Sequence, residues 1–251
     1  MDGAVLGLFL LATFLGGMTS GIVGFAMGLV VSGIWLHILT PIQTAALIVL
    51  YGLVTQGYGL WKLRHALNWR TIAPFIIGGA IGVPIGTLLL TYIDPAYLRI
   101  GVGALILLYG IYGLAQPAFK PVKAGIAADV TIGILNGILG GLTGLVGIVM
   151  TIWSQWRGWS KDVQRTVFQP VIFAAAVLSA ISLGLAGAVT AETAKLFLLG
   201  LPLMLAGLWL GFRLYGKLDD AAFRKMILCL LVVAGLSLMV PASIFGLVAA
   251  R

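Results

Sequence analysis

The chain consists of long apolar runs separated by short polar segments, and the lengths of these runs predict membrane-spanning helices. A helix needs about 20 apolar residues to cross about 30 Å of hydrocarbon. The apolar residues are continuous and do not alternate with polar ones, so the strands of a membrane β-barrel are not expected. Six runs have the required length: Ile42–Trp61, Thr71–Ile93, Ala96–Ala115, Val163–Val189, Ala194–Tyr215 and Phe223–Val248.

Two further apolar runs are longer and are interrupted by glycine. Val5–Leu39 contains the glycine-rich segment 15–24, and Gly125–Trp156 contains the glycine-rich segment 136–147. Each run is too long for one straight span and too short for two full spans. We therefore expect both runs to be broken near the middle, either as re-entrant hairpins or as single bent spans.

Composition places the chain among membrane proteins. It has 251 residues, of which 61% are apolar and 9% are charged, and its mean hydropathy is +1.14. Globular domains are about 45–50% apolar and about 25% charged. This composition excludes a soluble enzyme, a disordered chain and an ordinary nucleic-acid-binding protein. The net charge of +8 comes from residues in the short polar segments, and the single cysteine, Cys229, permits no intrachain disulfide.

The distribution of basic residues favours hairpins over single crossings. If each long run crossed the membrane once, the 15 lysines and arginines would divide seven to eight between the two faces. If each long run returned to its own face, the division would be twelve to three. Because basic loops remain in the cytoplasm, we expect hairpins, with both termini outside. The twelve are Lys62, Arg64, Arg70, Lys120, Lys123, Arg157, Lys161, Arg165, Arg213, Lys217, Arg224 and Lys225.

An internal repeat divides the chain into residues 1–116 and 117–251. A shift of 125 aligns Gly82, Gly86, Asp94 and Arg99 with Gly207, Gly211, Asp219 and Arg224, and a shift of 120 aligns Gly17, Gly21 and Gly24 with Gly137, Gly141 and Gly144. Chance matches among 35 glycines are the alternative. Three crossings per half would invert the second copy, so the expected fold is an all-α polytopic protein. It would contain two inverted repeats, each a glycine-broken hairpin plus three transmembrane helices, an arrangement typical of secondary transporters.

The glycine-rich breaks are candidate anion sites. A helix that begins at such a break presents unpaired amides and the positive end of its dipole, and glycine lets an oxyanion approach the backbone. We expect the two breaks to share one small anion near the midplane. The alternative is that the glycines serve helix packing. The candidate binding residues are Thr19, Ser20, Gly21, Gly24, Gly140, Gly141, Thr143 and Gly144.

Neutral amide side chains within the spans are further candidates, because they are costly in lipid and suit an anion that must also be released. Gln56 and Gln169 are the strongest of them for substrate binding. Interhelical hydrogen bonding is the alternative for each, and an arginine near a span end also fits an interfacial, snorkelling residue. The candidate gate or lining residues are Gln43, Asn136, Gln164 and Arg165.

Other features of the sequence predict close helix packing and argue against catalysis and metal binding. Glycines recur every four residues at Gly78, Gly82 and Gly86 and again at Gly207 and Gly211, which favours close helix contacts between the halves or in a homodimer. His37 and His65 lack metal-ligand spacing, and no nucleophile–base pair is visible. We therefore expect no enzyme activity, no catalytic residue, no metal, no cofactor and no nucleic-acid partner, and membrane lipid as the surroundings.

The segments Gly17–Gly33, Trp61–Arg70, Ile76–Gly86 and Gly137–Gly147 resemble the TauE/SafE sulfite exporter family, also called the toluene-sulfonate uptake permease family. The resemblance implies a multi-pass permease of a bacterial or archaeal inner membrane for small sulfur-containing anions such as sulfite, sulfoacetate or other organosulfonates. Our first hypothesis is therefore a secondary transporter of such an anion that works by alternating access. The family often has Thr-Ser or similar small residues after each broken run, where this chain has Thr44–Leu47 and Arg165–Gln169. This departure leaves the particular anion open. The alternative function is a non-transporting membrane scaffold.

Overall fold

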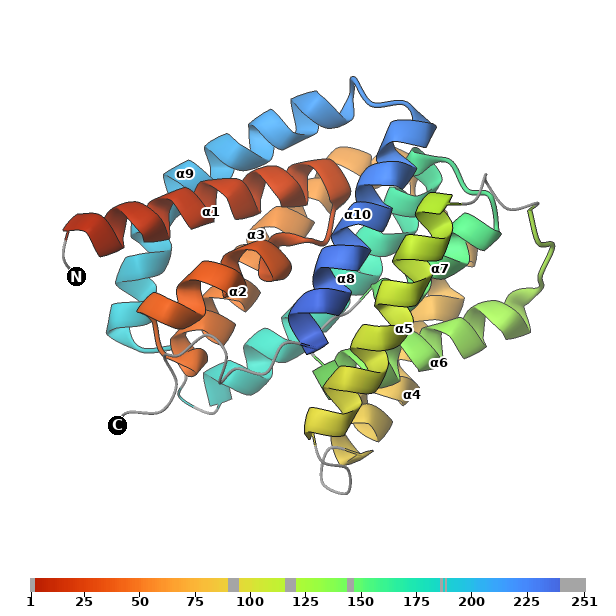
Figure 1. Ribbon diagram of the computed structural model, residues 1–251, viewed down its shortest axis with the longest axis horizontal. Helices are drawn as coiled ribbons and strands as arrows, with labels where there is room; N and C mark the ends of the chain where they lie inside the picture. Colours follow the sequence, from red (N-terminus) through yellow and green to blue (C-terminus); the bar gives the residue numbers. More distant parts are fainter. Residues whose placement is uncertain are drawn as a thin grey trace. The chain divides into compact units, whose positions relative to one another are not determined.

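The computed structural model describes residues 3–89, 95–115, 121–143, 147–185, 187 and 189–239, and the regular structure within these residues is helical (Figure 1). The all-α prediction is confirmed for this part of the chain. The helices are α1 (Gly3–Val23), α2 (Met27–Ile38), α3 (Pro41–Leu63), the short 3-10 turn η1 (Arg64–Ala66), α4 (Trp69–Leu89), α5 (Pro95–Ala115), α6 (Ile126–Thr143), α7 (Ile148–Trp156), α8 (Lys161–Leu185), α9 (Ala191–Tyr215) and α10 (Asp220–Met239).

Several of these helices are long and apolar enough to cross a membrane. Among the described residues, five satisfy both conditions, namely α1, α3, α4, α8 and α9. The protein is therefore a multi-pass membrane protein. Its helix bounds follow the apolar runs because, within a bilayer, backbone groups are satisfied by hydrogen bonds inside each helix.

Both long runs are divided into two helices. Helix α1 ends at Val23 and α2 begins at Met27, while α6 ends at Thr143 and α7 begins at Ile148. Gly24 has a φ of +95° and Gly147 a φ of +109°, a left-handed conformation that is strained for other residues. With 12 residues, α2 is roughly 18 Å long, which is too short to cross the hydrocarbon.

The first break lies later than the glycine pattern indicated. The sequence placed it across residues 16–24, but α1 continues helically through Gly16, Gly17 and Gly21. Glycine alone does not end a helix in an apolar environment, because an unpaired backbone group there is costly. These glycines instead permit close packing, and only Gly24 adopts a conformation that a helix cannot contain.

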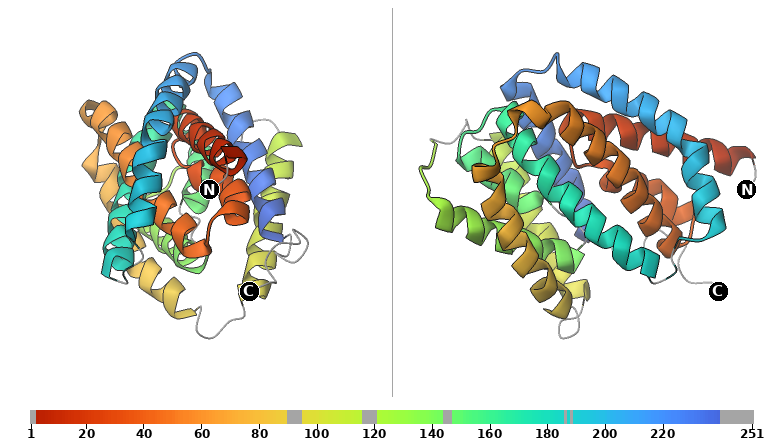
Figure 2. Two further views of the ribbon diagram at one scale, coloured as in Figure 1. Left: turned by 90° about the vertical axis from the view of Figure 1, so that its left-hand side faces the viewer. Right: turned by 180° about the vertical axis from the view of Figure 1, so that it is seen from behind.

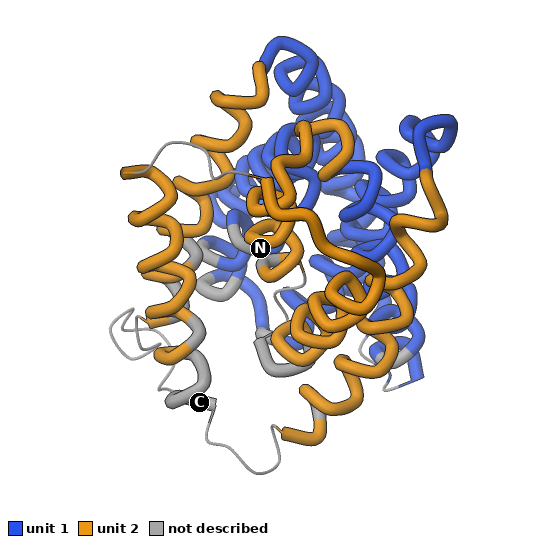
Figure 3. The backbone as a smooth tube through the Cα atoms, turned by 90° about the vertical axis from the view of Figure 1, so that its right-hand side faces the viewer, with its two compact units in different colours: residues 1–67, 165–218 blue, residues 68–164, 219–251 orange. Residues whose placement is uncertain are grey.

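Contacts divide the chain into two compact units (Figure 3). Unit 1 comprises residues 1–67 and 165–218, and unit 2 comprises residues 68–164 and 219–251. Each unit therefore takes helices from both halves of the sequence. The two units therefore differ in their bounds from the predicted repeats 1–116 and 117–251, and the repeats stay a prediction.

In unit 1, α1 and α9 run side by side in the same direction (Figure 1; Figure 2, right). A Cβ built on Gly17 would lie 2.3 Å from the Met204 carbonyl oxygen, and one on Gly207 would lie 2.2 Å from the Phe14 carbonyl oxygen. Such separations leave no space for a side chain. The core of this unit includes Phe9 of α1 and Trp35 of α2, whose ring centroids are 5.3 Å apart.

In unit 2, α4 and α6 pack in the same manner. A Cβ on Gly82 would lie 2.1 Å from the Ile134 carbonyl oxygen, and one on Gly86 would lie 2.3 Å from that of Ile138. The glycine repeats thus serve packing between helices of the two sequence halves, as expected. The homodimer stays a prediction, since these glycines face helices of their own chain.

Helices α5 and α10 of unit 2 also meet at glycine, but they run in opposite directions. A Cβ on Gly110 would lie 3.2 Å from the Leu228 carbonyl oxygen, and one on Gly235 would lie 2.7 Å from the Gly103 carbonyl oxygen. Gly103, in the first half of α5, thus meets Gly235 near the end of α10, as expected for antiparallel helices.

Candidate functional site

Three polar side chains of unit 1 converge on the break between α1 and α2. The Nε2 atom of Gln56, from α3, donates a hydrogen bond of 2.5 Å to the Gly24 carbonyl oxygen. A Cβ built on Gly24 would lie 3.9 Å from Nε of Arg165 and 4.0 Å from Nε2 of Gln169, both on α8. The left-handed glycine is thus surrounded by two amides and one guanidinium.

A second glycine positions the Gln169 amide. A Cβ on Gly59, on α3, would lie 2.1 Å from Nε2 and 2.4 Å from Oε1 of Gln169. The amide therefore lies against the bare backbone of α3, one turn after Gln56. Any side chain at Gly59 would occupy the space that the amide now fills.

Arg165 is a buried cation held between aromatic rings. Its side chain is 1% exposed, and its guanidinium carbon lies 4.0 Å from the ring centroid of Phe212 and 4.4 Å from that of Tyr215, both on α9. Such contacts contribute about 2 kcal/mol or more when desolvated. The rings hold the positive charge beside Gly24 instead of letting it extend to the membrane surface, as the snorkelling alternative required.

The site also contains polar atoms suited to a polar ligand. Among the described residues, the buried Oε1 atoms of Gln56 and Gln169 have no hydrogen-bond partner, a condition that costs about 1–3 kcal/mol for each atom. The N-cap of α2, Ala26, makes no side-chain cap. The first-turn amides of α2 therefore receive no side-chain acceptor from the cap and point toward the break.

The remaining candidates on α1 have other environments. The Thr19 hydroxyl donates to the Leu15 carbonyl oxygen within its own helix. Gly21 packs against α9, where a Cβ would lie 2.5 Å from the Leu208 carbonyl oxygen. Ser20 is buried one turn before the break, and its carbonyl oxygen accepts a 2.9 Å bond from the Gly24 N–H.

At the second break, in unit 2, Gly147 is hydrogen-bonded to two side chains. The Gly147 N–H donates to Oδ1 of Asn136 over 3.0 Å, and the Thr151 hydroxyl donates to the Gly147 carbonyl oxygen over 2.8 Å. Gly140 is a helical residue of α6. Gly144 lies outside the described residues, and Gly141 and Thr143 are described only as backbone of α6.

Gln43 and Gln164 lie at helix beginnings. Gln43 accepts from the Thr40 N–H over 3.2 Å in a capping box, and its Nε2 donates to Glu192 over 3.2 Å. Gln164 donates to the Trp159 carbonyl oxygen over 2.9 Å at the start of α8. Both glutamines thus bond to groups near the beginnings of their own helices.

Sequence reasoning missed Gly59, Phe212 and Tyr215, because neither a glycine nor an aromatic residue in an apolar run carries a polar signal. It also missed Asp129 of unit 2, whose carboxylate accepts from Trp153 Nε1 over 2.9 Å and pairs with Arg157 over 3.2 Å. In the part of the chain that the structure describes, no group of three or more metal-ligating side chains could hold an ion.

Comparison with known proteins decides the family. The model of the sulfite exporter TauE/SafE family matches residues 9–238. The chain belongs to this family. Its members are transporters, so the protein is a transporter and not an enzyme. The "Probable sulfite/organosulfonate exporter TauE" of Cupriavidus necator is 28% identical over 228 residues, which cover 88% of each chain. No solved structure matches this chain.

Proposed function

We propose that this TauE/SafE protein is a secondary transporter of a bacterial or archaeal inner membrane, and that it exports sulfite or a small organosulfonate. We place its anion site in unit 1, at the break between α1 and α2. The observation that carries the proposal is the buried Arg165 guanidinium beside Gly24. The rings of Phe212 and Tyr215 hold this positive charge at the site, where it would attract an oxyanion.

The surrounding groups suit an oxyanion that must bind and then leave. The Gln56 and Gln169 amides are neutral donors, and the beginning of α2 adds partial positive charge without a second full charge. One fixed cation and several weak donors favour moderate affinity, which a transporter needs. Anion efflux would be driven by an inside-negative potential, worth about 2.3 kcal/mol per charge per 100 mV.

Glycine contacts support the inverted repeat of residues 1–116 and 117–251. In unit 1 Gly207 meets the Phe14 carbonyl, and in unit 2 Gly82 meets the Ile134 carbonyl. These residues correspond under the shifts of 120 and 125 found in the sequence. The shift of 125 likewise relates the contact of Gly110 with Leu228 to the contact of Gly235 with Gly103. Chance glycine matches would not reproduce the same backbone contacts.

The directions of α5 and α10 support hairpins at the long runs. If each long run crossed the membrane once, α5 and α10 would be the fourth and eighth crossings and would run in the same direction. With hairpins they are the third and sixth crossings and run in opposite directions, which agrees with the contacts of Gly110 and Gly235. This agreement favours the topology with twelve basic residues in the cytoplasm.

Alternating access to the Gly24 site is part of the proposal. The site would open to the cytoplasm for loading and to the outside for release. Whether the second break shares the anion stays a prediction, because Gly144 lies outside the described residues.

Sulfite efflux from proteoliposomes tests the proposal. We expect Arg165→Gln to raise the half-saturating sulfite concentration roughly 10- to 100-fold, because a hydrogen bond to a charged group contributes about 1.5–3 kcal/mol. Arg165→Lys retains the charge and should keep part of the activity. The matched control is Arg213→Gln, since Arg213 is an exposed α9 arginine that also stacks on a ring, that of Trp209 at 4.0 Å.

Wild-type efflux by Arg165→Gln would contradict the site. Absence of sulfite and sulfonate efflux from wild-type proteoliposomes would favour the scaffold alternative, for which a buried cation has no function.

A further inference from the structure

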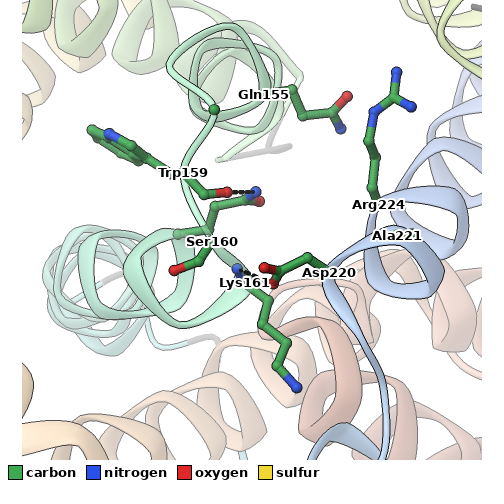
Figure 4. Close-up of a pocket in the computed structure, with 9 residues that line it drawn as sticks. Gln155, Trp159, Ser160, Lys161, Asp220, Ala221 and Arg224 are labelled. Carbon is green, nitrogen blue, oxygen red and sulfur yellow. Dashed lines mark hydrogen bonds between the residues drawn. The ribbon is translucent and has the colours of Figure 1, made fainter. Parts of the chain in front are cut away.

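Unit 2 contains a pocket that shares no residue with the Gly24 site. It has a volume of about 490 Å³ and lies at the turn between α7 and α8, beside the beginning of α10 (Figure 4). This volume falls within the range of sites for small organic molecules. The lining residues that carry the argument are Gln155, Trp159, Lys161, Gln164, Asp220 and Arg224.

Gln155 presents an unused donor to this pocket. Its side chain is 7% exposed, and its Oε1 accepts a 3.2 Å hydrogen bond from the Tyr109 hydroxyl. That bond orients the amide, and its buried Nε2 has no partner among the described residues. A buried donor without an acceptor costs about 1–3 kcal/mol, so an acceptor atom of a ligand would stabilise it.

A positive charge lies on the same side of the pocket as this donor. Figure 4 shows the Gln155 amide and the Arg224 guanidinium on that side, whereas the Lys161 side chain extends away from both. Arg224 Nη2 donates to the Gly113 carbonyl oxygen over 3.1 Å, which fixes the side chain. A guanidinium beside an amide N–H is a suitable contact for a carboxylate or sulfonate.

The pocket also contains acceptors. Gln164 donates from Nε2 to the Trp159 carbonyl oxygen, and its buried Oε1 has no partner among the described residues. The Asp220 carboxylate accepts from the Lys161 N–H over 2.9 Å at the start of α8. These oxygens would repel a bare anion but would accept from a hydroxyl or ammonium group.

We propose that this pocket binds a small organic acid that carries a hydrogen-bond donor at its other end. The acid group contacts Gln155 Nε2 and Arg224, and the donor group contacts Gln164 Oε1. This inference does not rest on the proposed transport substrate.

Trp159 lines the pocket and therefore reports binding in detergent solution, without transport. The measurement is tryptophan fluorescence during titration with 2-hydroxyethanesulfonate, compared between the wild type and Trp159→Phe. We expect a saturable change that Trp159→Phe removes. Trp156→Phe is the matched control, because Trp156 is 41% exposed and does not line the pocket, and it should retain the change.

Ethanesulfonate, which lacks the hydroxyl, should bind at least fivefold more weakly than 2-hydroxyethanesulfonate. Gln164→Leu should remove this difference between the two ligands. Equal affinity of both ligands for the wild type would overturn the role of Gln164.

Gln155→Glu replaces the donor with a negatively charged acceptor and should weaken binding of both ligands at least tenfold. Gln155→Met, which removes the donor without adding charge, provides a second test if the glutamate variant does not fold. No saturable change in the wild type, or unchanged affinity in a folded Gln155 variant, would overturn the proposal.

Arg165→Gln separates this pocket from the Gly24 site. It should leave the Trp159 titration unchanged while sulfite efflux falls, so failure of either proposal is recognised independently of the other.

Discussion

The breaks at Gly24 and Gly147 share a left-handed glycine but differ in their hydrogen bonds. At Gly147, Asn136 accepts from the N–H and Thr151 donates to the carbonyl. At Gly24, Gln56 donates to the carbonyl, and Arg165 and Gln169 lie within about 4 Å of a Cβ position. Two similar backbone breaks are thus stabilised differently. Among the described residues, only the first has a buried cation beside its glycine.

This difference allows the two breaks to be tested separately as ligand sites. Asn136 at the second break satisfies a backbone group, so its removal should affect folding. Gln169 at the first break leaves its own Oε1 without a partner, so its removal should affect the ligand. Substitutions at these positions can separate the two roles.

The largest expected effect is the contrast between Gln169→Leu and Asn136→Leu. Gln169→Leu should raise the half-saturating sulfite concentration roughly 10- to 100-fold with little loss of stability, since an amide–anion hydrogen bond contributes about 1.5–3 kcal/mol. Asn136→Leu should leave that concentration unchanged and cost about 1–3 kcal/mol of stability, because the Gly147 N–H is left unpaired. Efflux from proteoliposomes and melting temperature in detergent measure the two quantities. The reverse pattern would contradict the comparison.

An intermediate loss of stability is expected at the glycine contacts between helices, which occur inside each of the two units. Gly207→Ala and Gly82→Ala each place a Cβ against a carbonyl oxygen and should each cost about 1–3 kcal/mol by overpacking. The melting temperatures should fall by similar amounts if the repeats are equivalent. Gly79→Ala is the control on α4, because a Cβ there meets no atom within 4 Å. Strongly unequal losses would argue against equivalent repeats.

The smallest effect is expected at Gly59. Gly59→Ala must displace the Gln169 amide and should reduce sulfite affinity by up to about tenfold, which corresponds to about 1.4 kcal/mol. Gly52→Ala on the same helix meets no atom within 4 Å and should leave affinity unchanged. Competition of unlabelled with labelled sulfite during efflux measures the affinity. Equal sulfite affinities of the two variants would show that Gly59 does not contribute to the site.

Much of the helix pattern follows from the sequence because it depends on local properties. Apolar runs long enough to cross a bilayer become helices in which each backbone group is satisfied nearby. The run Ala194–Tyr215, for example, corresponds to α9, Ala191–Tyr215. The position of the first break did not follow, because a glycine that packs against another helix and a glycine that ends a helix look alike in a sequence.

Some residues of the candidate site could be selected from the sequence, but its other members and its geometry could not. Gln56, Gln169 and Gly24 could be selected because amides and glycine breaks are unusual within a span. Arg165 was ambiguous, since an arginine near the end of an apolar run fits a surface position equally well.

The sequence by itself determined a polytopic helical membrane protein with two long runs that are each divided, because these depend on residue type and spacing along one segment. The internal repeat stays a prediction. The tertiary structure alone decided that Arg165 is enclosed by Phe212 and Tyr215, and that Gln169 lies against Gly59. Those contacts join residues that are far apart in the chain. They form only when separate helices pack against one another, so no local pattern records them.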